Sequence, residues 1–144
     1  MQYEIKGGSM PVVVCTLQNG ESIKTEKGAM SWMSPNMEMQ TNAGGGIGKA
    51  FSRIFTGESM FQNIYTARGG TGLIAFASSF PGEILAIPVS ASRSIVAQKH
   101  AFLAMESGVE VKLFFQKRFG SGLFGGEGFI MQQLRDSIKT EFCK

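Results

Sequence analysis

Two glycine-rich stretches have the residue types of phosphate-binding loops, but neither meets the full requirement of such a loop. Residues 44–50 read Gly-Gly-Gly-Ile-Gly-Lys-Ala. A Walker loop at this spacing needs glycine at position 43 and a magnesium-binding hydroxyl at position 50, and both positions are alanine. Residues 120–125 match the dinucleotide fingerprint by letter, yet no helical pattern follows them. We therefore interpret both stretches as flexible loops.

The residues for a metal site or a hydrolytic triad are too few. The chain has one histidine, His100, and two cysteines, Cys15 and Cys143, which lie far apart in the sequence. This set does not supply the ligands of a zinc site, and no serine lies in the context of a nucleophile elbow. Cys15 lies in an apolar run and is interpreted as a buried thiol. We expect no catalytic residue, no metal and no cofactor.

Two carboxylates occupy equivalent places in two related segments. Glu58 and Glu127 each follow a glycine, in residues 55–61 and 124–130 respectively. Paired acids hydrolyse glycosidic bonds when they face each other across a cleft. The alternative, which we favour, is a Gly-Glu turn in which the carboxylate accepts hydrogen bonds from backbone N–H groups.

Two loops that interleave basic residues with phenylalanine are the main candidates for an interaction site. Loops of this type can stack on the bases of single-stranded nucleic acid or insert their rings at an anionic membrane surface. In a simpler alternative, the rings close the ends of a β core and the cations are solvated. The residues are Lys49, Phe51, Arg53 and Phe55 in the first loop, and Lys117, Arg118, Phe119 and Phe124 in the second.

Short β-strands are the elements that must position these residues. Turn signals recur about every 8–12 residues, which is typical of an all-β sandwich or roll, and no long amphipathic helix is evident. Asn19-Gly20 predicts a hairpin turn that folds the following strand straight back. A single helical turn is the alternative for residues 49–54. The expected strands span residues 3–6, 11–17, 22–26, 29–33, 37–40, 60–67, 72–78, 84–89, 94–97, 101–105, 109–116 and 128–134.

The chain also contains an internal similarity. Residues 26–39 align with residues 98–111 at a constant offset of 72, where a Lys, an Ala, a Met and a Glu coincide. Residues 55–61 align with residues 124–130 at an offset of 69. We infer a duplicated β unit.

The two repeats differ in their apparent length. Repeat one covers about residues 10–90 and repeat two about residues 94–134. Residues 135–144 have no glycine corner and no alternation of apolar and polar residues. We therefore expect an atypical tail and an incomplete second repeat within a single all-β domain of 144 residues.

The composition points to a chain that hides part of its surface. Hydrophobic residues make up 43 % of the chain and charged residues 17 %, a low share that indicates an oligomer or an apolar face offered to a partner. The net charge of +3 permits only weak attraction to nucleic acid or anionic lipid. The N-terminus does not resemble a signal peptide. We expect a cytoplasmic protein, with membrane association as an open alternative.

Several motifs resemble those of a known family. They are Gly28-Ala29-Met30, Arg53 with Gly57-Glu58-Ser59, Phe80-Pro81-Gly82, Ala101-Phe102-Leu103-Ala104 and Gly125-Gly126-Glu127-Gly128. Their order over residues 1–134 resembles the bacterial and mitochondrial-biogenesis family of unknown function built on a duplicated TRAP-like fold, where TRAP is the tryptophan RNA-binding attenuation protein. The resemblance implies two facing sheets per unit, two units per chain and a ring-like homo-oligomer, with a trimer favoured. It implies no activity.

These observations favour a non-enzymatic β scaffold that self-associates, with the two basic-phenylalanine loops as a contact for a membrane surface or a protein partner. The alternative is a protein that binds single-stranded RNA, another nucleic acid or a small ligand. The only tryptophan, Trp32, lies on a short expected strand and is interpreted as a core residue or a subunit contact.

Overall fold

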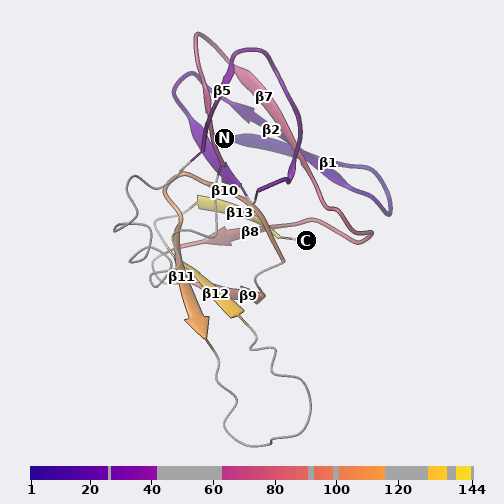
Figure 1. Ribbon diagram of the computed structural model, residues 1–144, viewed down its shortest axis with the longest axis vertical. Helices are drawn as coiled ribbons and strands as arrows, with labels where there is room; N and C mark the ends of the chain where they lie inside the picture. The colour runs from indigo at the N-terminus through magenta and orange to yellow at the C-terminus, as the bar shows by residue number, and fades with distance from the viewer. Residues whose placement is uncertain are drawn as a thin grey trace, which may run out of the picture.

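The computed structural model describes residues 1–25, 27–41, 63–90, 93–98, 101–115, 130–135 and 139–143. Within these ranges the chain is all-β and its strands pair antiparallel (Figure 1). No helix in these ranges has the length and apolar character needed to cross a membrane. The strands are β1 (Gln2–Lys6), β2 (Val12–Leu17), β3 (Ser22–Thr25), β4 (Met30–Met33), β5 (Met37–Thr41), β6 (Asn63–Ala67), β7 (Gly72–Ala77), β8 (Leu85–Val89), β9 (Ile95–Gln98), β10 (Phe102–Glu106), β11 (Glu110–Phe115), β12 (Ile130–Arg135) and β13 (Lys139–Cys143).

A four-stranded sheet lies at the upper end of the molecule in Figure 1, with the order β1-β2-β7-β4. Its central strands are rich in Val, Ile and Phe, which suit a pleated surface that packs on at least one face. Alternate residues of β2 are fully buried, namely Val13, Cys15 and Leu17, while those between them are half-buried. One face of this sheet therefore forms the core.

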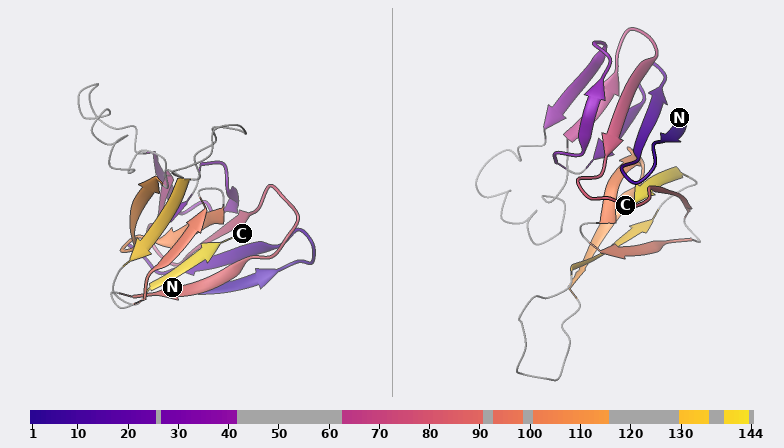
Figure 2. Two further views of the ribbon diagram at one scale, coloured as in Figure 1. Left: turned by 90° about the horizontal axis from the view of Figure 1, so that it is seen from below. Right: turned by 90° about the vertical axis from the view of Figure 1, so that its right-hand side faces the viewer.

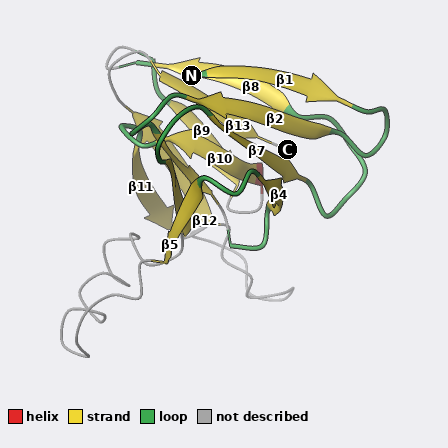
Figure 3. Cartoon of the chain, turned by 90° about the horizontal axis from the view of Figure 1, so that it is seen from above, coloured by secondary structure: helices red, strands yellow, loops and turns green. Residues whose placement is uncertain are grey.

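A six-stranded sheet, with the order β5-β6-β3-β10-β13-β8, supplies the other side of this core. The ring of Tyr65 on β6 meets the ring of Phe76 on β7 edge to face, with centroids 6.3 Å apart. Both rings are almost completely buried, so they join the two sheets. Figures 2 and 3 show the sheets from three further directions. The shared core contains Val13, Cys15, Leu17, Ile23, Ala29, Met37, Tyr65, Ala67, Ile74, Phe76, Ile84, Leu103 and Ala104.

A three-stranded sheet, with the order β11-β12-β9, lies at the lower end of Figure 1. A second, smaller apolar cluster joins it to the six-stranded sheet. Val89, Phe102, Met105 and Val109 are buried in this cluster, and Ile95 on β9 packs against them. Strand β9 therefore pairs with β12 along one edge, and its Ile95 packs against this cluster.

The strand pairings of the first half of the chain recur in the second half. Strands β5-β6-β3 are joined in the same order as β11-β12-β9. Glu38 lies opposite Thr66, and Glu110, 72 positions after Glu38, lies opposite Arg135, 69 positions after Thr66. The two offsets are those found in the sequence. The strands within each three-strand group are therefore paired in equivalent registers.

The remaining strands follow the same rule. Strands β4-β7-β2 are joined in the same order as β10-β13-β8. Trp32 lies opposite Ala75, and Ala104, 72 positions after Trp32, lies opposite Phe142, 67 positions after Ala75. The register shift that precedes the first pair also precedes the second. Strand β1 is an addition to the first group, at the outer side of β2.

The turn at Asn19-Gly20 forms, but the expected hairpin does not. Gly20 has a φ of +84°, a conformation that glycine adopts without strain. The prediction that the two flanking strands pair with each other is wrong, because β2 belongs to the four-stranded sheet and β3 to the six-stranded sheet. The turn carries the chain from one layer of the core to the other.

Strands are found at every expected position that the structure describes, and one strand was not expected. Residues 139–143, for which the local sequence predicts no strand, form β13 between β10 and β8. Its residues acquire strand structure from pairing on both sides rather than from local preference. The helical turn suggested for residues 49–54 lies outside the described residues.

Candidate interaction surface

The residues that sequence reasoning placed in interaction loops lie outside the described residues. The same holds for the repeated acids Glu58 and Glu127 and for His100. These assignments therefore stay predictions. The loop residues concerned are Lys49, Phe51, Arg53 and Phe55, and Lys117, Arg118, Phe119 and Phe124.

The outer face of the four-stranded sheet carries apolar side chains that no other described strand covers. Residues directly opposite each other on antiparallel strands point to the same side. One such row runs from Glu4 through Val14 and Ala75 to Trp32. Its neighbouring rows bring Val12, Ala77 and Leu73 to the same face. The apolar residues of this outer face are Val12, Val14, Trp32, Leu73, Ala75 and Ala77.

Exposure of the two largest side chains marks this face as a surface for contact. Trp32 is 45 % exposed and Leu73 is 40 % exposed, whereas Ala75 beside Trp32 is fully buried. Contiguous apolar surface of this kind, with an aromatic residue in it, is typical of protein interaction sites. The interpretation of Trp32 as a core residue is therefore wrong. A role as a subunit contact stays a prediction.

The composition of the central strands supports the same conclusion. Strand β7 reads Gly-Leu-Ile-Ala-Phe-Ala and strand β2 reads Val-Val-Val-Cys-Thr-Leu, so both are mostly apolar on their two faces, with Thr16 as the polar exception. Strands with this pattern are usually covered on both sides, whereas a strand with one wet face alternates with polar residues. Among the described residues, another sheet packs only on the inner face. The composition of these strands therefore suits a sheet whose outer face is also covered by protein.

Polar residues border the apolar face at strand β1. Lys6 Nζ lies 3.0 Å from Glu4 Oε2, and both side chains are well exposed. An exposed pair of this kind adds little to stability. Tyr3 and Ile5, on the opposite side of β1, lie at the ends of rows that are buried further in at Cys15 and Val13. The edge at β1 is thus partly apolar on its inner side and charged on its outer side.

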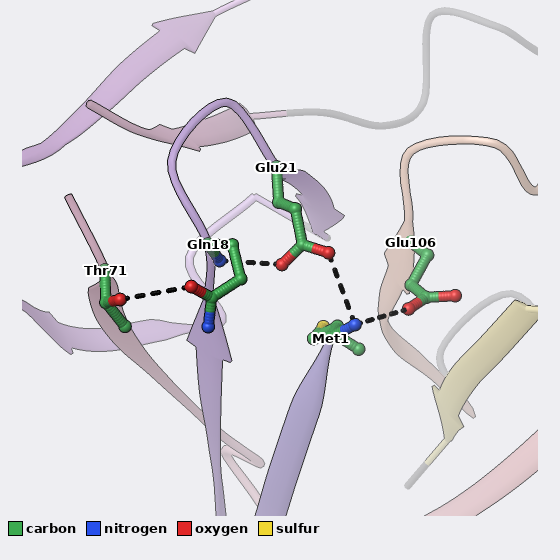
Figure 4. A network of polar contacts seen from close by, with 5 residues as sticks. All are labelled: Met1, Gln18, Glu21, Thr71 and Glu106. Atoms are coloured by element: carbon green, nitrogen blue, oxygen red, sulfur yellow. Dashed lines mark hydrogen bonds and ion pairs between the residues drawn. The ribbon is translucent and has the colours of Figure 1, made fainter. Parts of the chain in front are cut away.

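A polar network ties the first residue to two other parts of the fold (Figure 4). The amino group of Met1 lies 3.4 Å from Glu21 Oε1 and 3.8 Å from Glu106 Oε1. The backbone N–H of Gln18 donates to Glu21 Oε2 at 2.7 Å, and the hydroxyl of Thr71 donates to Gln18 Oε1 at 3.3 Å. The network joins β1, the 18–21 turn and the end of β10.

The electrostatics of this network suit a structural role. The hydrogen bond from the Gln18 N–H is the main cause of the lowered pKa of the Glu21 carboxyl; burial opposes it, and the Met1 amino group lowers the pKa further. A carboxyl with a lowered pKa stays ionised near neutral pH and is a poor proton donor. Glu21 therefore acts as an acceptor that holds the turn in place.

The cysteine expected to be buried is confirmed as such. Cys15 is fully buried on β2, and burial, reinforced by the nearby Glu106 carboxylate, raises the pKa of its thiol to about 12. Reactive thiols have lowered pKa values and partial exposure, so this one is structural. Among the described residues there is no group of three or more His, Cys, Asp or Glu side chains placed to hold a metal ion.

Comparisons with known proteins place the chain among uncharacterised relatives. Residues 3–137 match the model of a family described as mitochondrial biogenesis AIM24. The chain is 29 % identical over 137 residues to an uncharacterised protein of Streptococcus pyogenes serotype M6. The alignment includes 90 % of this chain and 54 % of that protein, so the chain spans about half the length of this relative.

A solved structure has the same fold. The X-ray crystal structure of protein SPYM3_0169 from Streptococcus pyogenes superimposes with a TM-score of 0.79 at 25 % sequence identity. The superposition includes 99 % of this chain and 63 % of that one. The arrangement of sheets described above is thus shared with that protein.

Proposed function

The chain belongs to the mitochondrial biogenesis AIM24 family, whose bacterial relatives above are uncharacterised, and from this premise we propose that it is a non-enzymatic β scaffold that associates with further copies of itself. The single observation that carries the proposal is the apolar outer face of the four-stranded sheet. Trp32 and Leu73 stand on it in contact with solvent, although the strands beneath are apolar on both faces. A second copy would give this sheet the second layer that its composition suits.

We also propose that the fold is a duplicated TRAP-like one. Six strands of the first half, β2 to β7, correspond in order and register to six strands of the second half, β8 to β13. On this basis the second unit has the same set of strands as the first, with β13 in the place of β7. The likeness to TRAP rests on the family resemblance, and it favours a ring, with a trimer as the preferred form.

The absence of catalytic function is part of the proposal, and two of the described titratable groups support it. Glu21 is an ionised acceptor in a turn, and Cys15 is a buried thiol with a raised pKa. Neither has the poised protonation state that acid–base or nucleophilic catalysis requires.

The molar mass in solution tests the proposal. Size-exclusion chromatography with light scattering, run over a hundredfold range of concentration, should give a discrete multiple of the 15.6 kDa chain. A mass of one chain throughout the range would overturn the scaffold proposal.

Contacts of the two basic-phenylalanine loops form a separate part of the proposal. If these loops bind an anionic membrane, vesicles that contain anionic lipid should retain the protein, and Phe51→Ser with Phe124→Ser should release it. If they instead bind single-stranded RNA, the affinity should fall steeply as the salt concentration rises, because phosphate contacts release counterions. If the vesicles do not retain the protein and its affinity for RNA does not depend on salt, the loops have neither role.

A further inference from the structure

The six-stranded sheet contains a junction between the two halves of the chain. Strand β3, from the first half, pairs with β10, from the second half, and this pairing joins β5-β6-β3 to β10-β13-β8. Thr25 lies opposite Ala104 and Lys24 lies opposite Met105. Thr25, Ala104 and Met105 are all buried. The junction therefore merges two three-strand groups into one continuous, well-packed sheet.

Two other strands, β9 and β4, hold positions equivalent to those of β3 and β10, but within the described residues neither has a strand paired to its outer edge. Strand β9 holds the position in β11-β12-β9 that β3 holds in β5-β6-β3. Strand β4 holds the position in β4-β7-β2 that β10 holds in β10-β13-β8. Both β4 and β9 stand at the edge of a sheet. They hold the positions that β10 and β3 hold in the internal junction, and in the part of the chain that the structure describes they do not pair with each other.

We propose that β9 of one copy pairs antiparallel with β4 of the next copy and so repeats the β3–β10 junction between chains. This inference rests on the proposed self-association and adds to the face contact proposed above a contact between strand edges. The 72-residue relation between the halves also gives the register. It sets Trp32 opposite Ala97 of the next copy, Met33 opposite Val96, and Ser34 opposite Ile95.

Exposure of these residues agrees with a missing partner. Trp32 is 45 % exposed, whereas its counterpart Ala104 is fully buried in the internal junction. Val96 is 54 % exposed, while its counterpart Lys24 is half-buried. Large apolar side chains thus stand in solvent at both edges, and unpaired strand edges are sites where another strand adds readily.

The residues brought together are chemically compatible. In the internal junction the basic residue Lys24 lies opposite Met105. In the intermolecular junction the corresponding contact joins Met33 to Val96, and both residues are apolar. No like charges face each other in this register, and two of its three rows, Trp32–Ala97 and Met33–Val96, are apolar.

One difference limits the length of the intermolecular ladder. The backbone N–H of Ser107 donates to the carbonyl of Ser22 at 3.3 Å and extends the internal junction beyond β10. Pro35 stands 72 positions before Ser107 and has no N–H to donate. The ladder between chains therefore ends earlier than the ladder within the chain.

The geometry of the contact restricts the type of assembly. Because β4 and β9 are different surfaces, the interface is head-to-tail, and such an interface forms either a closed ring or an open fibre. In a closed ring, internal and intermolecular junctions alternate and every β4 and β9 edge is covered.

Cysteine cross-linking tests the register. Directly opposed residues of antiparallel strands have Cα atoms about 4.5–5.5 Å apart, which a disulfide spans. The double variant Met33→Cys/Val96→Cys, made with Cys143→Ser, should form disulfide-linked multimers on mild oxidation, seen on a non-reducing gel. The matched control is Met39→Cys/Val96→Cys, because Met39 on β5 is 51 % exposed but lies outside the proposed junction. It should remain a single chain on the gel.

The solution mass separates this inference from the scaffold proposal. Val96→Asp should raise the concentration at which the assembly dissociates by at least about tenfold, because a charge would enter an apolar junction. Met39→Asp should leave that concentration unchanged, and circular dichroism should show both variants folded. If the wild-type protein is a single chain at every concentration, both proposals fail. If the wild-type protein is an assembly, but the cysteines do not cross-link and Val96→Asp keeps its mass, only the β4–β9 junction is refuted.

Discussion

The thiol of Cys15 should be almost unreactive while the chain is folded. It is fully buried on β2, where Tyr3 and Ile74 lie opposite it on the two flanking strands. Burial is the main cause that raises the pKa of this thiol from its ordinary value of 9.0 to about 12. Only the thiolate attacks thiol reagents, so both access and ionisation protect the residue.

The size of the effect follows from the two pKa values. At about pH 8 an ordinary thiol with a pKa of 9.0 is roughly 10 % thiolate, whereas a thiol with a pKa of about 12 is roughly 0.01 % thiolate. Ionisation alone thus slows labelling by about a thousandfold, and exclusion of the reagent slows it further. Labelling of the folded protein should therefore report unfolding events rather than direct attack.

The assay uses the variant Cys143→Ser, in which Cys15 is the remaining thiol. Release of the coloured product of a disulfide reagent is followed in native buffer and in concentrated guanidinium chloride. The expected ratio of the two rates is at least about a thousandfold. A native rate within about tenfold of the denatured rate, with an unchanged circular dichroism spectrum, would refute the reasoning.

The same pKa shift predicts how stability depends on alkaline pH. Between pH 9 and about pH 12 the unfolded chain loses the Cys15 proton and the folded chain keeps it, so the free energy of unfolding falls as the pH rises. The slope is at most about 1.4 kcal/mol per pH unit. Urea denaturation of wild type and Cys15→Ala should diverge in slope only in this range. Parallel curves would show that the thiol does not contribute.

Two further substitutions test packing and the polar network, each by chemical denaturation at a fixed protein concentration. Glu21→Gln should lower the free energy of unfolding by about 0.5–1.5 kcal/mol, because it weakens the acceptor for the Gln18 N–H. Since the pKa of Glu21 is lowered from its ordinary value of 4.5, this difference should be complete above that pH and disappear as the pH falls through the lowered pKa. Gly72→Ala should cost about 1–3 kcal/mol, because the new Cβ would overlap the sulfur of Met37 in the core. Gly8→Ala is the control, since a Cβ there meets no atom within 4 Å, and equal losses for the two alanines would contradict the packing account.

Local sequence preference predicts most of the strands but not their partners. Runs such as Val12–Leu17 favour the extended backbone whatever they pair with, because branched side chains suit a pleated surface. The Asn19-Gly20 turn shows the limit of this reasoning. The sequence predicts the turn, yet whether the next strand stays in the same sheet depends on long-range contacts, and here it crosses to the other layer.

Strand β13 is a second element that local sequence preference does not predict. Lys139–Cys143 has no strong local preference, and its strand structure comes from pairing with β10 and β8 on both sides. The offsets of 72 and 69 found in the sequence give the register of the β11–β12 pair relative to β5–β6, but β13 follows β7 at an offset of 67, so they do not give its register. Applied to the tail, the repeat calls for a strand in the place of β7.

The sequence predicts that the chain has an interaction surface, but not where on the fold it lies. A low share of charged residues and two-sided apolar strands predict that some surface is covered. Which surface it is depends on strand order, which places the exposed Trp32 on β4 at the end of a sheet. Val96 has no distinguishing signal of its own in the sequence. Its significance comes from the position of β9 beside β12.

Because the two halves share their register, the effect of a substitution can be compared at two equivalent strand positions of the same chain. Met33 and Met105 are the same residue, on matched strands that follow the same register shift, but Met105 is fully enclosed and Met33 is not. The difference between the costs of Met33→Ala and Met105→Ala therefore measures the effect of surroundings at constant local geometry. Such a pair of measurements separates intrinsic strand preference from tertiary context, which ordinarily requires two different host proteins.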